Sequence, residues 1–593
     1  MSSALAGENA AGAGGPDDKP RPRVAGGPPA TPGRRAYALA IRYGPIVIPT
    51  AAMVAAGIVG LARDSSMGND EVATRWAALL SLRELAHLLR HVDAVHGFYY
   101  LLLHAWVAVG SSPAIIRVPS VIAMAASAAL VAILARRLTG SGWAALFTGL
   151  IMVLTPSITY YAQTARSYAL VYACVALATL ALLRALDAES GAAAGRVGLR
   201  WLGYAVLIAL SGYLNEMALL VLGAHAVTVL LARYGRRAIA HWAAAAAGAV
   251  VLVLPLLAVS VGERTAIAFL ARPGRADVKI LFHDYFGAAT TVAVLLLLCA
   301  VIAVLPVGPA WPRSPAILTD PKSPTTPASH TTPASHTTPA SHTVPASHTA
   351  PASHTVSPSH TVPAAIQPAT AWWRGGISLP SVAAPLLIVP AFLLAAESRI
   401  GTPLYIDRYV LYGEAGAALL AGAGVYRLGQ WLARYGRRPG LLIAPGAVVC
   451  VLALMLQLGA QKQIRTPGSR AYDFGGPARF VAAHSRPGDG VLYFGTLFRK
   501  VELGYPADFR KVTDFAEAKS PRQDGDFRGT DKTFAQTLPL MLSYQRIWVI
   551  GDPPSGQLRA ALLQQESGVL ESKFRLIDSR TFRGITVTLW QRR

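Results

Sequence analysis

The sequence is poor in charged residues and in cysteine. Only 14% of its 593 residues are charged, whereas about 25% is usual for a soluble domain, and 53% are hydrophobic. Its three cysteines lie inside apolar runs, without the spacing of a disulfide framework or of a cysteine-based metal site; they are Cys174, Cys299 and Cys450. The composition therefore excludes an ordinary soluble globular protein and a disulfide-stabilised secreted scaffold.

Acidic residues and nucleotide-binding patterns are also scarce. The chain has 31 acidic against 54 basic residues, a net charge of +23. The arginines gather at the ends of apolar runs, which favours membrane orientation and contact with anionic lipid headgroups over nucleic-acid binding. We therefore predict membrane lipids and no nucleic acid among its partners. No GxGxxG or Walker pattern precedes a helix in the C-terminal region, so the sequence offers no ATP site.

The sequence is rich in long hydrophobic segments. Apolar runs of roughly 17–25 residues recur through the first three quarters of the chain, the length that crosses a bilayer. They predict a polytopic α-helical membrane protein with about eleven spans. We expect the spans at 45–62, 114–135, 143–160, 168–183, 201–214, 217–231, 239–261, 288–307, 377–396, 409–426 and 441–459. The run 97–110 is expected to dip into the interface without crossing, because this places Arg136 and Arg137 in the cytoplasm.

Composition divides the chain into three regions. Residues 1–43 form a Gly/Pro/Ala-rich basic tail, expected to be disordered and cytoplasmic because Arg34, Arg35 and Arg42 precede the first span. Residues 44–460 form the transmembrane catalytic module, interrupted by a cytoplasmic linker at 308–374. This linker repeats Pro-Ala-Ser-His-Thr-x and cannot bury a core. Residues 461–593 are predicted to be a small extracytoplasmic α/β domain, with strands at 491–494 and 546–550, helices at 477–484 and 556–566, and a closing hairpin at 574–591. The predicted location is thus a multi-pass protein of the cell membrane.

Acidic and basic side chains are expected to meet at the extracytoplasmic membrane face. Asp70 and Glu71 follow the first span, and arginines come from later, well-separated loops, among them Arg166 and Arg408. Ionisable groups next to apolar segments are costly and usually functional or paired. An acid that can accept a proton, opposite guanidinium groups that can hold an anion, suits transfer of a group from a phosphate carrier.

Several short motifs in a fixed order resemble those of the GT-C superfamily glycosyltransferases, in the family 39 and aminoarabinose-transferase-like branch. No single motif is specific, but their order and spacing over residues 44–460 are distinctive. They are Asp70-Glu71, Asp93-Ala-Val-His96-Gly-Phe-Tyr-Tyr, Ile116-Arg117-Val-Pro-Ser120, Ala135-Arg-Arg-Leu-Thr-Gly140, Tyr160-Tyr-Ala-Gln-Thr-Ala-Arg166-Ser-Tyr168 and Asp407-Arg408-Tyr409.

This resemblance implies a donor, a base and a phosphate site. Members of the superfamily transfer a sugar from a polyprenyl-phosphate donor outside the cytoplasmic membrane, so the acceptor is expected to be an extracytoplasmic glycan, lipid or protein, with mannose as one candidate sugar. Asp70 matches the first-loop aspartate that acts as general base. Arg166, Arg408 and Tyr409 are candidates for contacting the donor phosphate. The candidates for supporting or substrate-binding roles are Glu71, Asp93, His96, Arg117, His283 and Asp284; Arg117 is expected to pair with an acid of the first loop.

Other interpretations stay open on the sequence. Many relatives have Asp-x-x-His-Pro where this chain has Val95-His96-Gly97, which weakens the role of His96. A divalent metal would suit two carboxylates and His96, but the spacing does not decide it. Asp70 could instead cap a helix, and Arg166 and Arg408 could anchor lipid headgroups. A transporter or lipid flippase is the alternative function, although no internal repeat is visible and the acids lie at one face. A third hypothesis is a non-catalytic assembly protein.

Overall fold

The computed structural model describes residues 32–61, 66–189, 197–263, 271–305, 376–551 and 561–593. The chain forms two compact units, Met1–Gly44 and Pro45–Arg593. The predicted linker 308–374 and most of the predicted tail 1–43 lie outside the described residues.

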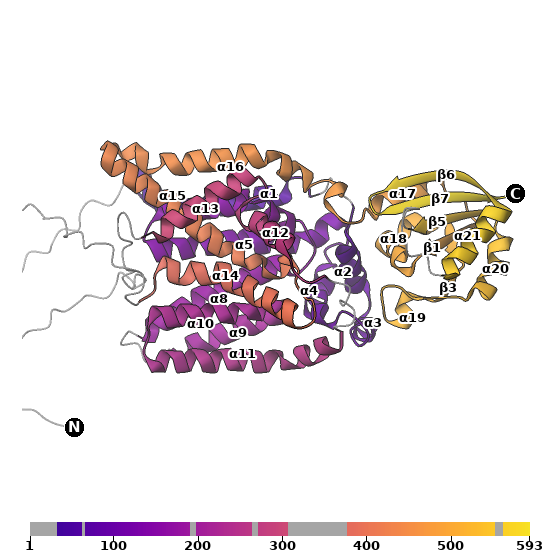
Figure 1. Cartoon of the computed structure of the whole chain (residues 1–593), viewed down its shortest axis with the longest axis horizontal. Helices are drawn as coiled ribbons and strands as arrows, with labels where there is room; N and C mark the ends of the chain where they lie inside the picture. Colours follow the sequence, from indigo (N-terminus) through magenta and orange to yellow (C-terminus); the bar gives the residue numbers. More distant parts are fainter. Residues whose placement is uncertain (1–31, 62–65, 190–196, 264–270, 306–375, 552–560) are drawn as a thin grey trace, which may run out of the picture. The chain divides into compact units, whose positions relative to one another are not determined.

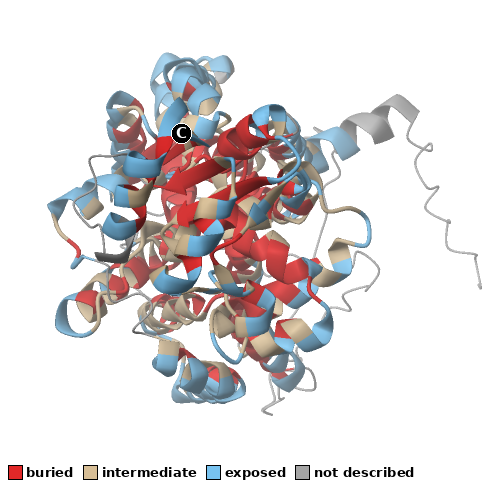
Figure 2. Cartoon of the chain, turned by 90° about the vertical axis from the view of Figure 1, so that its right-hand side faces the viewer, coloured by how far each residue is buried: buried red, intermediate tan, exposed pale blue. Residues whose placement is uncertain are grey.

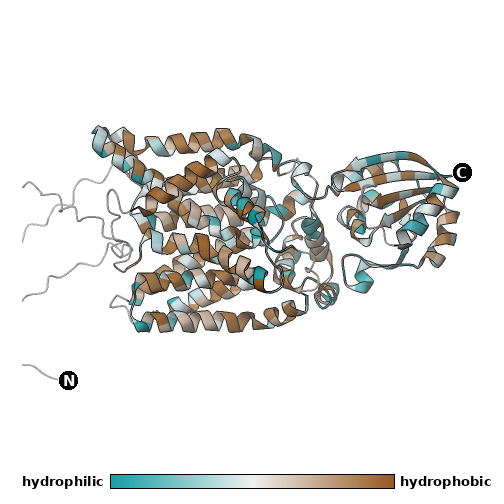
Figure 3. Cartoon of the chain, viewed as in Figure 1, coloured by the Kyte–Doolittle hydropathy of each residue, from teal (hydrophilic) through white to brown (hydrophobic). Residues whose placement is uncertain are grey.

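The larger unit contains a bundle of long helices (Figure 1), in which hydrophobic residues, coloured brown in Figure 3, predominate. Seven helices in the described residues are long and apolar enough to cross a membrane. They are α1 (Pro32–Ile58, apolar from Leu39), α5 (Pro113–Thr139), α8 (Tyr168–Glu189), α9 (Val197–Leu214), α11 (Arg236–Glu263), α14 (Leu379–Ile400) and α16 (Ala444–Gln463).

Two further pairs of apolar helices are bent, so that each pair forms either a broken span or a re-entrant loop. Helix α6 (Gly142–Leu154) bends by 71° into α7 (Pro156–Ala162), and α12 (Arg275–Phe286) bends by 74° into α13 (Thr290–Val304). The first break follows the ordinary rule that proline cannot continue a helix, since Pro156 stands at the first position of α7. The described helices therefore supply seven spans, or nine with the bent pairs, and the predicted eleven are not confirmed.

The two remaining predicted spans are helices of another kind. One is short: η3 (Glu216–Leu220) continues into α10 (Val221–Ala232). The other is α15 (Glu414–Gly436), which follows η6 (Asp407–Gly413) and packs against α6, α13 and α14, with most of its first half buried. A helix enclosed by other helices needs small residues more than hydrophobic length, so α15 is rich in alanine and glycine.

Glycine allows α15 to touch its neighbours backbone to backbone. A Cβ at Gly422 would lie 2.5 Å from the backbone of Thr148 in α6, and one at Gly424 would lie 1.7 Å from the carbonyl oxygen of Cys299 in α13. No side chain fits at either position, so the close approach of α15 to both helices depends on these glycines.

Short helices fill the segment between α1 and α5. They are α2 (Asn69–Leu79), α3 (Leu82–Leu88), η1 (Ala94–His96) and α4 (Gly97–Trp106). Helix α4 has 10 residues, about 15 Å of helix, which is half the thickness of the hydrocarbon core. The prediction that 97–110 does not cross agrees with this length.

The C-terminal region is an α/β fold around a five-stranded sheet of order β2-β1-β5-β7-β6, and its central strands are buried (Figure 2). Strands β2, β1 and β5 are parallel, while β7 pairs antiparallel with β5 and β6. The strands are β1 (Asp489–Phe494), β2 (Val512–Asp514), β5 (Arg546–Gly551), β6 (Phe574–Phe582) and β7 (Ile585–Arg592), with a separate pair β3 (Glu517–Lys519) and β4 (Thr530–Asp531).

Helices and 3-10 turns surround this sheet and connect it to the bundle. Part of the predicted helix 556–566 lies outside the described residues, which resume at α21. These elements are η8 (Pro467–Ser469), α17 (Gly475–His484), η9 (Thr496–Arg499), α18 (Lys500–Gly504), η10 (Pro506–Phe509), α19 (Pro521–Asp524), α20 (Phe534–Ser543) and α21 (Ala561–Lys573). The 3-10 turn η7 (Pro439–Leu442) instead joins α15 to α16 within the bundle.

The C-terminal domain packs against α2. Its core shares one hydrophobic cluster with the segment after α1, in which Met67 and Val72 join Phe474 and Val501. The hydroxyl of Tyr505 accepts a hydrogen bond of 2.8 Å from the backbone N–H of Met67. Residues 45–593 consequently form one compact unit, although composition had suggested two separate modules.

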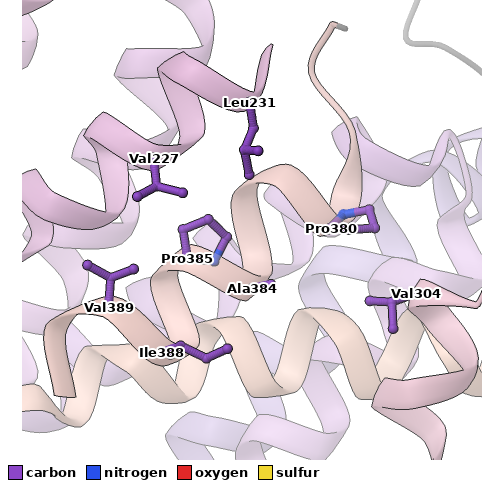
Figure 4. Close-up of a pocket in the computed structure, with 8 residues that line it drawn as sticks. All are labelled: Val227, Leu231, Val304, Pro380, Ala384, Pro385, Ile388 and Val389. Carbon is purple, nitrogen blue, oxygen red and sulfur yellow. The ribbon is translucent and has the colours of Figure 1, made fainter. Parts of the chain in front are cut away.

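An apolar groove of about 420 Å³ lies between α10, α13 and α14 (Figure 4). Val227 and Leu231 of α10 face Pro385 and Val389 of α14 across it. The groove is near the beginning of α14, whereas η6 follows the end of α14. The groove therefore lies toward the end of the bundle opposite to η6. Its lining residues are all apolar.

Candidate active site

Asp70 lies in the first turn of α2, where the helix dipole favours a negative charge. Its carboxylate Oδ2 is 3.4 Å from Nη2 of Arg408, and the Asp70 side chain keeps 36% of its surface exposed. The pair is thus open to a ligand on one side. The negative charge of Asp70 also interacts with the positive charge of Arg166.

The electrostatic surroundings keep Asp70 ionised. Burial by itself would raise its pKa, but the positive charges of Arg166 and Arg408 outweigh burial and lower the pKa to about 2. At any physiological pH the carboxylate is therefore free of its proton and able to accept one.

Arg408 is held by aromatic side chains as well as by Asp70. Its Nε donates a hydrogen bond of 2.9 Å to the hydroxyl of Tyr168, and its guanidinium lies over the rings of Tyr168 and Tyr409, 5.8 and 6.0 Å from their centroids. The hydroxyl of Tyr285 donates to the backbone carbonyl of Val410, which fixes η6 against α12. The predicted phosphate residues Arg408 and Tyr409 therefore lie together at the side of Asp70.

Arg166 reaches the same region from the loop between α7 and α8. Its Nη1 donates to the hydroxyls of Thr74 at 3.2 Å and Tyr100 at 3.3 Å, and its side chain is almost fully buried. The loop is fixed because Gln163 donates to the carbonyl of Gly57 at 2.8 Å. A rigid loop places this guanidinium before any ligand binds, which is the property of a preorganised anion site.

Asp93 and His96 lie close to Arg166. Asp93 has a left-handed backbone (φ 64°), and its carboxylate accepts a hydrogen bond from the hydroxyl of Tyr100. The Nε2 atom of His96 lies 2.8 Å from Nη2 of Arg166. Burial, reinforced by the charge of Arg166, lowers the pKa of His96 to about 4, so the ring is neutral and accepts this hydrogen bond.

These contacts do not fit a metal ion. The lone pair that His96 would offer faces a guanidinium, and Asp93 is engaged by Tyr100. Within the described ranges, no group of three His, Cys, Asp or Glu side chains is placed to hold a metal. We therefore derive no chemical step through a metal.

Glu71 points away from Asp70 and ties the segment after α1 to the rest of the protein. Its carboxylate pairs with Arg117 at 2.8 Å and with Arg470 at 2.7 Å, and it accepts the backbone N–H of Ala165 at 2.9 Å. The side chains of Glu71 and Arg117 are each 1% exposed. The predicted ion pair between Arg117 and an acid of the first loop is present, and Glu71 is that acid.

His283 and Asp284 lie in α12, and the side chain of Asp284 interacts with that of Asp407, the residue directly before Arg408. They line a polar cavity of about 410 Å³ together with Tyr160 and Tyr161. The ring of Tyr161 packs edge-on against Tyr168, with 5.5 Å between the centroids, and Tyr168 is the partner of Arg408. A substrate-binding role for His283 and Asp284 stays a prediction.

Two residues of the C-terminal region were missed by the sequence analysis. Arg470 completes the Glu71 cluster, and Lys500 donates a hydrogen bond of 2.9 Å to Asn69, the neighbour of Asp70. Lys500 follows the carboxyl end of the parallel strand β1, the edge at which open α/β sheets bind ligands. That position is the signal that could have identified it.

Proteins of known family and known structure resemble this chain in sequence or in fold. Residues 93–260 match the family model of dolichyl-phosphate-mannose-protein mannosyltransferases. Two crystal structures of ArnT from Cupriavidus metallidurans, one in the apo state and one bound to undecaprenyl phosphate, are similar. Each has 12% sequence identity and a TM-score of 0.51, covering 92% of this chain and 98% of ArnT. No curated protein matches the sequence. The predicted resemblance to the GT-C superfamily is confirmed at the level of the fold.

Proposed function

We propose that this chain, which has the fold of the GT-C membrane glycosyltransferases, transfers a sugar from a polyprenyl-phosphate donor to an acceptor outside the cytoplasmic membrane. The observation that carries the proposal is the partly exposed carboxylate of Asp70, paired at 3.4 Å with Arg408 and interacting with the positive charge of Arg166. A base and two cations at the end of an apolar bundle match a substrate whose phosphate lies at a membrane surface.

The proposed reaction is a single displacement at the anomeric carbon. The acceptor hydroxyl gives its proton to Asp70 while its oxygen forms a bond to that carbon. The bond from the carbon to the phosphate oxygen breaks, and polyprenyl phosphate leaves with one more negative charge. Arg166 and Arg408 stabilise this charge, and arginine suits the role because its planar fork can hold two phosphate oxygens.

The donor is also expected to activate the base. Without a donor, the positive charges of both arginines stabilise the ionised form of Asp70 and lower its pKa to about 2, which makes the carboxylate a weak base. A bound phosphate draws the same guanidinium groups and brings its own negative charge, and both effects raise the pKa of Asp70. Asp70 therefore becomes a stronger base, and accepts a proton more readily, only after the donor has bound.

The sugar and the acceptor belong to the proposal. Mannose is the sugar to test first, because the family model that matches 93–260 describes mannosyltransferases. The acceptor is a glycan, lipid or protein of the cell envelope, and we assign the α2 end of the bundle and the C-terminal domain to the extracytoplasmic side.

The direct test is a transfer assay with the purified full-length chain in lipid vesicles. Labelled polyprenyl-phosphate mannose and a cell-envelope fraction as acceptor are supplied, and both labelled product and released polyprenyl phosphate are measured. Stoichiometric release and incorporation support the proposal. Movement of the intact labelled donor across the bilayer, without any release of polyprenyl phosphate, would instead establish a flippase and overturn it.

Replacing Arg408 by glutamine is expected to raise the donor KM and lower kcat, together reducing kcat/KM by about 100-fold or more, because a charge-assisted contact to phosphate is lost. Arg408→Lys should restore only part of the activity, since a point charge replaces a fork that is fixed by Tyr168. Steady-state kinetics at varied donor concentration measure both values.

The matched control is Arg399→Gln, an exposed arginine at the end of α14. It removes the same charge close by in the sequence and should leave the donor KM within twofold of the wild-type value. Equal loss in both variants would show a general effect of surface charge and would remove Arg408 from the phosphate site.

A further inference from the structure

Lys500 of the C-terminal domain lies beside the candidate active site. Its Nζ donates a hydrogen bond of 2.9 Å to Oδ1 of Asn69 and lies 5.2 Å from the centroid of the Phe527 ring. Asn69 directly precedes Asp70 in the first turn of α2, and the charges of the ammonium and of the Asp70 carboxylate interact. The residue as a whole is only 8% exposed.

The position of Lys500 is fixed by the docking of its helix. α18 packs on α2 so closely that a Cβ at Gly504 would lie 2.9 Å from the side chain of Val72. Arg75 of α2 donates a hydrogen bond of 3.2 Å to the carbonyl of Gly504. Helix α2 therefore carries Asp70 in its first turn and packs against α18, which carries Lys500.

A buried ammonium is a costly way to make a structural contact. The hydrogen bond to Asn69 requires only a donor, and a neutral amide would supply it without the desolvation penalty of a charge. The charges around Lys500 do not fully offset that penalty: Asp70 and Asp93 favour the ammonium, while Arg166 and Arg528 oppose it. A positive charge at this position would be stabilised by an anionic ligand that binds beside it.

We propose that Lys500 is a third cation of the donor-phosphate site, supplied by the C-terminal domain, so that this domain is part of the active site. The inference rests on the proposed function and adds a residue that the membrane bundle does not contain. The ligand chemistry is the phosphate of the polyprenyl-phosphate donor, which the ammonium would approach from the side of Asn69.

The resting charge of Lys500 gives the proposal a distinct pH dependence. Burial lowers the pKa of Lys500 to about 8, although Asp70 and Asp93 counteract burial; Arg528 and Arg166 lower it further. Since kcat/KM reports the free enzyme, it should fall for the wild type above about pH 8 as the ammonium loses its proton. Lys500→Arg keeps its charge throughout and should extend activity to higher pH.

The experiment measures donor-site binding and transfer separately, with polyprenyl phosphate and labelled donor as probes. Lys500→Gln keeps a donor for Asn69 and should weaken polyprenyl phosphate binding, and raise the donor KM, by about 10- to 100-fold. Lys500→Arg should stay close to the wild type at pH 7. The control Lys519→Gln, an exposed lysine in the same domain (67% exposed side chain), should change neither value.

Each result decides the question. If Lys500→Gln binds polyprenyl phosphate with wild-type affinity and its kcat/KM falls at the same alkaline pH as that of the wild type, Lys500 has only a structural role and the proposal is wrong. A rise in the acceptor KM alone would place the residue in the acceptor site and overturn the proposal. Failure of the proposed function would appear differently, as absence of transfer by the wild type, whatever residue stands at 500.

Discussion

Replacing Asp70 by asparagine is expected to reduce sugar transfer by about 100- to 10,000-fold, the contribution of a general base. Asparagine has nearly the same shape and fits the first turn of α2, but it cannot take the proton from the acceptor hydroxyl. Initial rates of transfer from labelled donor, at equal amounts of folded protein, measure the loss. Asp508→Asn, which changes a half-buried acid of the C-terminal domain, is the control and should retain full activity.

The same variant should bind polyprenyl phosphate at least as tightly as the wild type. Asp70 and the phosphate compete for Arg408 and Arg166, so removing the carboxylate leaves both guanidinium groups to the ligand. Lost activity with retained or stronger binding separates a missing base from a damaged site. Undiminished transfer by Asp70→Asn would refute the role of Asp70 as base.

Replacing Glu71 by glutamine is expected to destabilise the protein by about 3 to 5 kcal/mol, because it leaves the guanidinium groups of Arg117 and Arg470 buried without their anion. Burial alone would raise the pKa of Glu71, but Arg117 and Arg470 outweigh it and lower the pKa to about 2. A lowered pKa means that the stabilisation is present above the ordinary value near 4.5 and is lost as the pH falls toward 2.

Thermal unfolding of the purified protein in one detergent, followed from pH 7 to about pH 3, measures both effects. The contribution of Glu71 to the stability of the wild type should stay constant down to about pH 4.5 and fall below it, and Glu71→Gln should start lower and change less. Glu84→Gln is the matched control, since Glu84 pairs with Arg522 at 3.2 Å on an exposed surface and should contribute about 1 kcal/mol or less. Equal shifts for both glutamates would contradict the assigned role of Glu71.

The sequence predicted which side chains would come together at the candidate site better than it predicted how they are held there. Asp70, Arg166 and Arg408 come from three distant segments, and the structure brings them together as the motif order had indicated. Sequence could not separate the adjacent acids Asp70 and Glu71, because one points to the accessible site and the other into a buried ion-pair cluster. Only the helical geometry of α2, with its two arginine partners for Glu71, distinguishes them.

The remaining differences come from tertiary packing. The number of spans stays a prediction, because length and hydropathy alone do not decide whether an enclosed, alanine- and glycine-rich helix such as α15 or a short one such as α10 crosses the membrane. Composition separated the C-terminal region from the bundle, but it could not show that Lys500 and Arg470 reach back to Asn69 and Glu71. Such contacts depend on how the domain docks, which local patterns do not encode.

The glycine contacts of α15 bear on how this protein can move. An alternating-access carrier works by rocking one half of its helices past the other, which requires a surface along which they can slide. At Gly422 and Gly424, the backbone of α15 instead lies against Thr148 of α6 and the backbone of Cys299 in α13, with no room for a side chain of its own. Such a seam resists shear, so we expect α15, α6 and α13 to move together rather than to slide past one another.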